Sequence, residues 1–172
     1  YMKVFHIDRL KLLSEGQTIT LFDDYALNAP HGHEICMQVR SMYPQGISEH
    51  GNRYLFLAEN DNWLYETILE NVRLLYHPKS QSRFQSFFAV TDVFLPQMME
   101  RLEATDSNSY VFEIDACKYD VYDMNIINDM KYGGAGTTLY HANRYWTKER
   151  SDNPLLELLL PLPVTVGRRV FK

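Results

Sequence analysis

The chain has 172 residues, which suits one domain with a single sizeable core. Its net charge of −5 excludes a general attraction to nucleic acid or anionic lipid, and its ordinary apolar and charged fractions (45% and 23%) exclude extensive disorder. No apolar run reaches the roughly 18 residues that cross a bilayer, and no signal-peptide pattern begins the chain, so we expect a cytoplasmic protein that binds no membrane.

The N-terminal half alternates strand-like and helical patterns. Residues 3–7 and 17–22 have the alternation of strands, and 34–42 has weak helical spacing. Gly, Ser and Asn predict a loop over 45–53. The clearest helix then starts at Asn60 or Asp61 and ends before Pro78. Its apolar positions recur at three- and four-residue spacing: Leu64, Ile68, Val72 and Leu75.

A second strand-and-helix pair follows. Residues 83–90 predict a strand with opposite faces, one carrying Phe84, Ser86 and Phe88 and the other Phe87 and Ala89. Thr91 or Asp92 is expected to cap the next helix. The buried side of that helix would consist of Met98, Met99 and Leu102.

The remaining chain completes the expected sheet. Residues 110–116 alternate cleanly as a strand, whereas 117–130 leave strand and helix open. A glycine-rich loop, a short helix and two proline-interrupted strands are then expected at 131–137, 139–146, 156–160 and 164–171. No repeat or linker divides this pattern, so we predict a single α+β domain over residues 2–172.

Two cysteines give little functional information. Cys36 and Cys117 are isolated, without a CxxC pair or metal-ligand spacing. We expect reduced thiols, although one long-range disulfide stays open. HGHE at 31–34 lacks the spacing of a helical HExxH site, so no metal centre is predicted.

Glu157 and His6 are candidate site residues because each lies in an apolar strand-like run. Glu157 is flanked by leucines in LLELLLP, where a lone charge is costly unless it has a partner or a function. The alternative is a glutamate that points to solvent from an edge strand. His6, between Phe5 and Ile7, has the alternative of an ordinary half-buried histidine.

The segment SRFQSFFA supplies further candidates. Either Phe87 or Phe88 is suited to stack on an aromatic ligand, and the other must belong to the core because the two face opposite sides. Arg83 is a candidate to bind a phosphate or to orient Glu157, or is a plain strand-edge charge.

The chain resembles the bacterial DUF2441 family, whose members have no settled activity. The likeness covers nearly the whole length through FHIDR, EGQTI, WLYETILENVRLLYHP, SRFQSFFA, ANRYW and ELLLPLPVTV. A more remote resemblance, based on His6, SRFQSFFA and Glu157, is to the ADP-ribosyltransferase superfamily. That resemblance implies a mixed or antiparallel split β-sheet core with flanking helices.

The superfamily resemblance also implies roles in binding NAD as a substrate. Glu157 would be catalytic, His6 and Ser86 would hydrogen-bond ribose hydroxyls, and Phe87 or Phe88 would stack on nicotinamide. Arg9 is a further candidate to contact a phosphate through its fork of donors, with a surface ion pair as the alternative, and Arg83 is a candidate to contact a phosphate or to orient Glu157. Leu155 stands where arginine-modifying members carry Glu or Gln, so transfer to arginine is not expected.

Two functional hypotheses follow. The first is an NAD-dependent mono-ADP-ribosyltransferase, a toxin or phage-defence effector that modifies an unknown acceptor macromolecule and has an antitoxin as its partner. The second is a catalytically inactive module on the same fold, which binds a nucleotide or a protein. Retention of activity after loss of Glu157 would favour the module.

Overall fold

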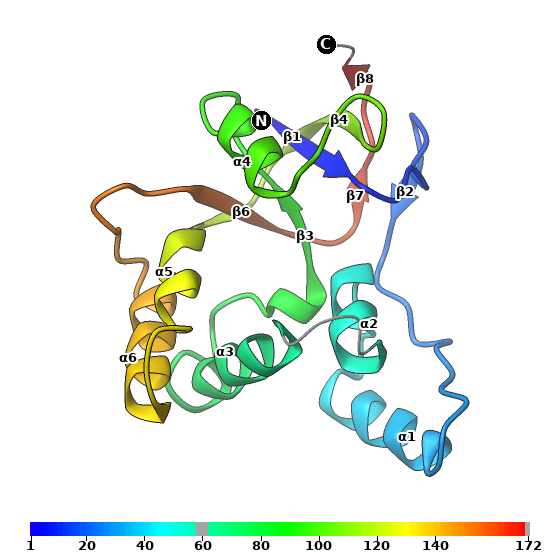
Figure 1. Cartoon of the computed structure of the whole chain (residues 1–172). Helices are drawn as coiled ribbons and strands as arrows, with labels where there is room; N and C mark the ends of the chain where they lie inside the picture. The colour runs from blue at the N-terminus through cyan, green and yellow to red at the C-terminus, as the bar shows by residue number, and fades with distance from the viewer. Residues whose placement is uncertain (58–61, 171–172) are drawn as a thin grey trace.

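The computed structural model describes residues 1–57 and 62–170 (Figure 1). Within those residues the fold is α+β, with three small antiparallel sheets and six α-helices. The strands are β1 (Met2–Asp8), β2 (Thr18–Ile19), β3 (Ser86–Ala89), β4 (Tyr110–Ala116), β5 (Asp120–Asp123), β6 (Leu156–Pro161), β7 (Val164–Thr165) and β8 (Arg169–Val170). The helices are α1 (Gly32–Met42), α2 (Glu49–Phe56), α3 (Asn62–Tyr76), α4 (Leu95–Arg101), α5 (Met124–Asp129) and α6 (Ala135–Trp146), with a 3₁₀ turn η1 (Arg83–Gln85).

Two three-stranded sheets form the centre of the molecule. One has the order β1-β4-β8 and the other β3-β6-β5, and β2 pairs with β7 beside them. An isolated bridge joins the two larger sheets where Phe5 and Val90 exchange backbone hydrogen bonds of 2.8 Å. Figure 1 shows α1, α2, α3 and α6 below the sheets, whereas α4 lies beside β1.

Strand β3 separates two parts of the core, as its alternation predicted. Phe87 and Ala89 pack against Val4, Ile114 and other apolar residues of the first sheet and β6. Phe88 points the other way, against the cluster that includes side chains of α3 and α6. The faces assigned from sequence to residues 86–89 are therefore confirmed, but residues 83–85 form η1 rather than strand.

Helix α2 occupies much of the segment that was predicted as a loop, and that prediction is wrong. The Ser48 hydroxyl caps the helix by accepting a hydrogen bond from the Gly51 N–H. A Cβ at Gly51 would lie 2.3 Å from the carbonyl oxygen of Phe84, so only glycine allows α2 to approach η1 this closely. The glycine that suggested a loop is a packing requirement instead.

Other boundaries also differ from the sequence predictions. Residues 117–130 divide into β5 and α5, and α6 begins at Ala135, inside the predicted glycine-rich loop. Phe94, rather than Thr91 or Asp92, occupies the N-cap of α4, whose Met98 and Met99 are buried as predicted. The expected cap of α3 at Asn60 or Asp61 lies outside the described residues.

Helix α3 is confirmed, but its buried face is partly charged. Leu64 and Leu75 are exposed, whereas Glu66, Glu70 and Arg73 are buried. Burial of carboxylates requires nearby cations or hydrogen bonds. Arg73 of the same helix pairs with Glu70, and Arg83 of η1 pairs with Glu66. The spacing of apolar residues cannot predict a buried helix face that contains charged residues.

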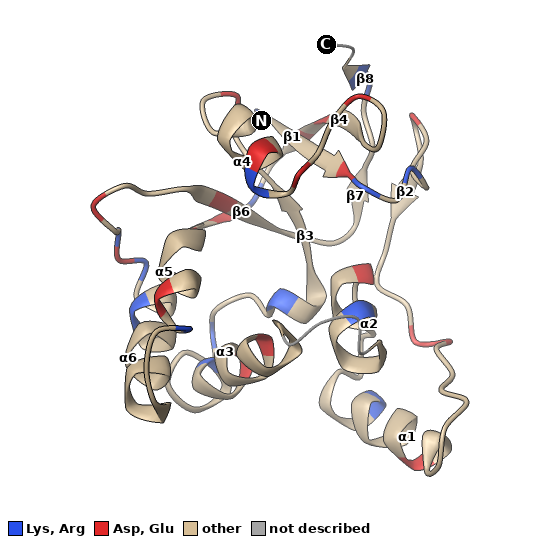
Figure 2. Ribbon diagram, viewed as in Figure 1, with Lys and Arg blue, Asp and Glu red and all other residues tan. Residues whose placement is uncertain are grey.

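Charged residues are spread over the whole ribbon (Figure 2). No helix in the described part of the chain is both long and apolar enough to span a bilayer. Cys36 is buried and Cys117 is exposed, and both are free thiols.

Candidate functional site

A cavity of about 370 Å³ is lined by residues of β1 and β3, including Phe5 and Val90 of the bridge. All seven residues singled out from the sequence line it, namely His6, Arg9, Arg83, Ser86, Phe87, Phe88 and Glu157. They come from β1, η1, β3 and β6, and from the turn after β1. The fold therefore brings residues up to 151 positions apart in the chain to one concave surface.

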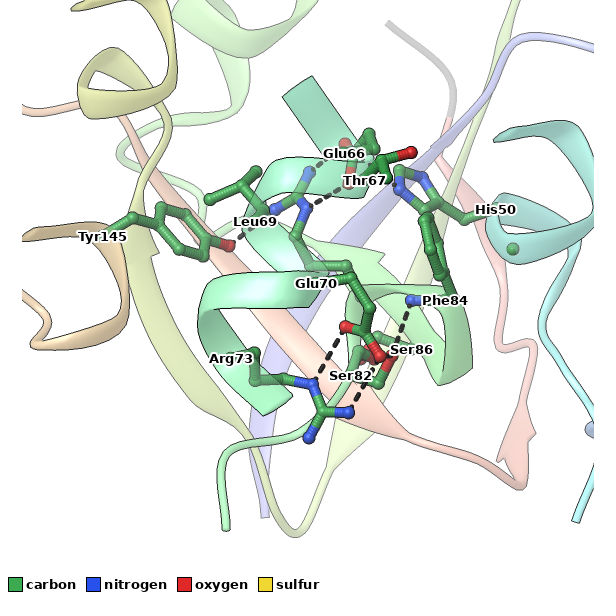
Figure 3. A network of polar contacts seen from close by, with 12 residues as sticks. His50, Glu66, Thr67, Leu69, Glu70, Arg73, Ser82, Phe84, Ser86 and Tyr145 are labelled. Carbon is green, nitrogen blue, oxygen red and sulfur yellow. Dashed lines mark hydrogen bonds and ion pairs between the residues drawn. The ribbon is translucent and has the colours of Figure 1, made fainter. Parts of the chain in front are cut away.

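Three buried charged residues, Arg83, Glu66 and Glu157, line the cavity. Together with the buried Tyr145, which is bonded to Arg83 and Glu157, we call them the Arg83 cluster. Arg83 Nε and Nη2 donate to the two carboxylate oxygens of Glu66 over 2.8 and 2.9 Å. Arg83 Nη1 contacts Oε1 of Glu157 and lies 2.5 Å from the Tyr145 hydroxyl. Figure 3 shows the Tyr145 hydroxyl directed toward the part of α3 that carries Glu66.

The charges of the Arg83 cluster are mutually stabilised. Burial lowers the pKa of Arg83, but Glu157 and then Glu66 outweigh burial, so the pKa lies well above its ordinary value. Burial alone would raise the pKa of Glu66, yet Arg83 and then His50 lower it far below the usual range. Burial, opposed by Arg83 and aided by Glu157, raises the pKa of the Tyr145 hydroxyl. With both carboxylates ionised, the cluster carries a net charge of −1.

Glu157 is only 3% exposed, because β6 places it between η1 and α6. Its Oε1 accepts from Arg83 and from the Tyr145 hydroxyl, the latter over 2.8 Å. Among the described residues, none donates a hydrogen bond to Oε2. Glu157 thus lines the cavity with Oε1 held by hydrogen bonds and Oε2 available to a ligand. The alternative of a solvent-facing edge glutamate is wrong.

His6 crosses the gap between the two sheets. Its Nδ1 lies 2.7 Å from the carbonyl oxygen of Phe88, and its ring packs against Phe87 with centroids 4.2 Å apart. A carbonyl only accepts, so Nδ1 carries the hydrogen. Burial, opposed by the Phe88 carbonyl and Asp8, lowers the pKa of His6. The neutral ring then presents Nε2 as a hydrogen-bond acceptor.

Phe88 is the better placed of the two phenylalanines for contact with a ligand. Phe87 is buried in the core beneath His6. Phe88 is partly exposed, and its ring lies 4.9 Å from the Arg83 guanidinium and 4.3 Å from the His50 ring. The Ser86 hydroxyl donates to the Ser82 carbonyl over 2.6 Å, which leaves its oxygen able only to accept.

The cationic side chains at the cavity differ in their surroundings. Arg9 is exposed at the end of β1, and Lys131 Nζ donates to Asn62 over 3.1 Å. Arg83, by contrast, is 4% exposed and directs its donors to Glu66, Glu157 and Tyr145. Arg9 is therefore better suited than Arg83 to meet an anionic ligand.

Sequence reasoning missed His50, Glu66 and Tyr145 as residues at or beside the cavity. Tyr140 is exposed, whereas Tyr145 is fully buried and bonded to Glu157. A signal for Glu66 was present, because a glutamate in the apolar stretch WLYETIL needs a partner. His50 had no such signal, since its helix was not recognised.

A second buried pair on α3 does not line the cavity. Glu70 accepts from Arg73, Tyr43 and Ser82, and we call these four residues the Arg73 cluster. Across the described residues, no group of three or more His, Cys, Asp or Glu is arranged to hold a metal ion.

Comparison with known families gives one match. Residues 4–171 match the family described as "Protein of unknown function (DUF2441)". The chain belongs to this family, because the match covers nearly its whole length. No curated protein matches the chain.

Proposed function

We propose that this member of the DUF2441 family binds NAD in the cavity between β1 and β3 and cleaves its nicotinamide–ribose bond, transferring ADP-ribose to an acceptor. The observation that carries the proposal is the cavity itself. It gathers a held carboxylate, a neutral histidine, an exposed arginine and an aromatic ring at one surface. Its volume of about 370 Å³ lies within the usual range for small-molecule sites.

Cleavage of this bond makes modest demands on a protein. The leaving group is a cationic pyridinium that departs neutral, so no general acid is needed, whereas a glycosidase must usually protonate an alkoxide. The main requirement is to stabilise the positive charge that develops on the ribose. A carboxylate about 4 Å away, at an effective dielectric of about 20, contributes about 4 kcal/mol, or roughly a thousandfold in rate.

Glu157 meets that requirement in this cavity. Arg83 and Tyr145 hold Oε1, so the carboxylate needs no reorganisation when charge develops nearby. Its Oε2 is available for the ribose. The net charge of −1 on the Arg83 cluster also favours a cationic group in the cavity.

The remaining residues suit the rest of the dinucleotide. His6 Nε2 can accept a hydrogen bond from a ribose hydroxyl, Phe88 can stack on the nicotinamide ring, and Arg9 can meet the diphosphate. A toxin or defence role belongs to the same proposal, with an antitoxin as its expected partner.

One observation favours the second candidate, an inactive nucleotide-binding module. Glu157 is 3% exposed and bonded to two residues, as expected for a structural anchor. In that case the cavity would bind the nucleotide while the carboxylate only held β6 to η1 and α6. The two candidates agree on binding and disagree on chemistry.

The test compares nicotinamide release from NAD by the wild-type chain, Glu157→Gln and Glu70→Gln. Glu70 is the matched control, because it is also a buried glutamate paired with an arginine but does not line the cavity. The enzyme proposal predicts that Glu157→Gln slows nicotinamide release by about a thousandfold. The same variant should still bind NAD, as measured by calorimetry. Glu70→Gln should release nicotinamide at the wild-type rate.

The other outcomes separate the candidates. Binding of NAD without release by the wild-type chain supports the module. Wild-type release that persists in folded Glu157→Gln removes Glu157 from the chemistry. Absence of both binding and release in the wild type overturns both candidates.

A further inference from the structure

His50 on α2 is a titratable side chain at the cavity that the proposed function does not yet use. It lines the cavity, and its side chain is 19% exposed. Its ring packs between Tyr54, with centroids 4.7 Å apart, and Phe88, with centroids 4.3 Å apart. An imidazole held between two rings keeps a defined orientation.

The two ring nitrogens of His50 have different environments. Nε2 lies 3.3 Å from Oε1 of Glu66, within ion-pair distance, but the geometry does not make a good hydrogen bond and no other described residue supplies one. Among the described residues, none forms a hydrogen bond with Nδ1. Figure 3 shows the His50 ring directed toward Glu66 at the end of the Arg83 cluster. A carboxylate so placed stabilises an imidazolium when the ring takes up a proton.

Backbone contacts fix this pair of side chains. The Ser48 N–H donates to the Phe84 carbonyl over 2.8 Å, and Gly51 packs against the same carbonyl. Glu66 is held from the other side by two hydrogen bonds from Arg83. Hence α2 and α3 are both held against η1, which fixes the distance between the His50 imidazole and the Glu66 carboxylate.

We infer that His50, oriented by Glu66, is the general base that takes the proton of the acceptor hydroxyl. This inference rests on the proposed function. In the reaction the bond from the ribose carbon to nicotinamide breaks, and its electron pair leaves with neutral nicotinamide. The acceptor oxygen bonds to that carbon, and its proton moves to Nδ1 of His50. Water replaces the acceptor in NAD hydrolysis, with ADP-ribose as product.

The groups around His50 define the expected pH dependence. Glu66 faces it from α3, Arg83 lies behind Glu66 from η1, and Tyr54 packs on it from its own helix. Phe88 of β3 is uncharged. Burial and then Glu66 raise the pKa of Tyr54, so that side chain stays neutral near pH 7. A general base must be unprotonated to act, so kcat should fall at low pH.

The experiment measures NAD hydrolysis against pH for the wild-type chain, His50→Gln, His50→Ala and His77→Gln. His50→Gln should lower kcat by about 100-fold, with little change in KM, and should lose the fall at low pH. Imidazole added to His50→Ala should restore part of kcat, which a merely structural histidine would not allow. His77 is the control, because it bonds to Asn143 and does not line the cavity.

Three results would overturn the inference. One is a wild-type kcat that does not fall at low pH, which needs no variant and so holds even if the His50 variants fail to fold. Another is a folded His50→Gln with wild-type kcat, while Glu157→Gln is inactive; here the proposed function survives alone. The third is a wild-type chain that neither binds nor cleaves NAD, in which case both fall together.

Discussion

Helix α3 carries two buried glutamates one turn apart, and the networks around them differ in one respect. Glu66 belongs to the Arg83 cluster and Glu70 to the Arg73 cluster (Figure 3). In the Arg73 cluster, Glu70 accepts from Arg73 over 2.8 and 2.9 Å, from Tyr43 over 2.9 Å and from Ser82 over 3.0 Å. Arg73 Nη1 donates to the Ser80 carbonyl over 3.0 Å.

Access to the cavity separates the candidate site from the structural ion pair. The Arg73 cluster joins the end of α1, α3 and the turn before η1, and none of its four residues lines the cavity. The Arg83 cluster has a similar composition, but Glu66, Arg83 and Glu157 all line the cavity, and Oε2 of Glu157 has no donor within the described residues. Both clusters are buried, but only the Arg83 cluster is accessible to a ligand in the cavity.

The largest effect on stability is expected from loss of the arginine that serves two carboxylates. Arg83→Met leaves Glu66 and Glu157 buried without their cation and should lower the free energy of unfolding by about 3–5 kcal/mol. Arg73→Met should cost less, because Glu70 keeps hydrogen bonds from Tyr43 and Ser82. Urea denaturation of both variants measures the difference, and equal losses would remove this distinction between the clusters.

An intermediate effect is expected from acid. The folded-state pKa of Glu66 is depressed below its ordinary value of 4.5, chiefly by Arg83 acting against burial. A depressed carboxyl pKa contributes stability above the unfolded pKa, and this contribution is lost as pH falls toward the folded pKa. The free energy of unfolding should therefore drop below about pH 4.5, with a contribution on the order of 2 kcal/mol from Glu66.

Glu66→Gln sharpens that measurement. The variant should be less stable than wild type at pH 7, and its stability should change less between pH 5 and pH 3, as followed by denaturation at each pH. Glu34→Gln, at an exposed glutamate of α1, controls for loss of an ordinary carboxylate. A Glu66→Gln profile parallel to wild type would show that Glu66 contributes no pH-dependent stability.

The smallest effect compares the tyrosine of each cluster. Tyr145→Phe and Tyr43→Phe each remove one hydrogen bond to a buried carboxylate, so each should lower the free energy of unfolding by about 1 kcal/mol. Under the proposed function, only Tyr145→Phe should also slow nicotinamide release, by about tenfold, because Glu157 loses one of its two donors. Equal release rates in the two variants would argue against a role for Tyr145 in holding the catalytic carboxylate.

Several features of this fold followed from the sequence because they depend on near neighbours. Residues 110–116 alternate, and β4 spans Tyr110–Ala116. The opposite faces of Phe87 and Phe88 follow from the two-residue period of a strand. The placement of Glu157 among leucines already indicated that the carboxylate needs a partner.

The partners of those residues depend on the tertiary structure. Arg83 meets glutamates 17 positions before it and 74 after it, and no local period encodes contacts at such separations. Glycine is required at position 51 of α2 because η1 approaches its backbone, although glycine by itself favours a turn. A residue's chemistry and its period are local properties, whereas the stability of a buried charge depends on a partner that only the folded chain brings within reach.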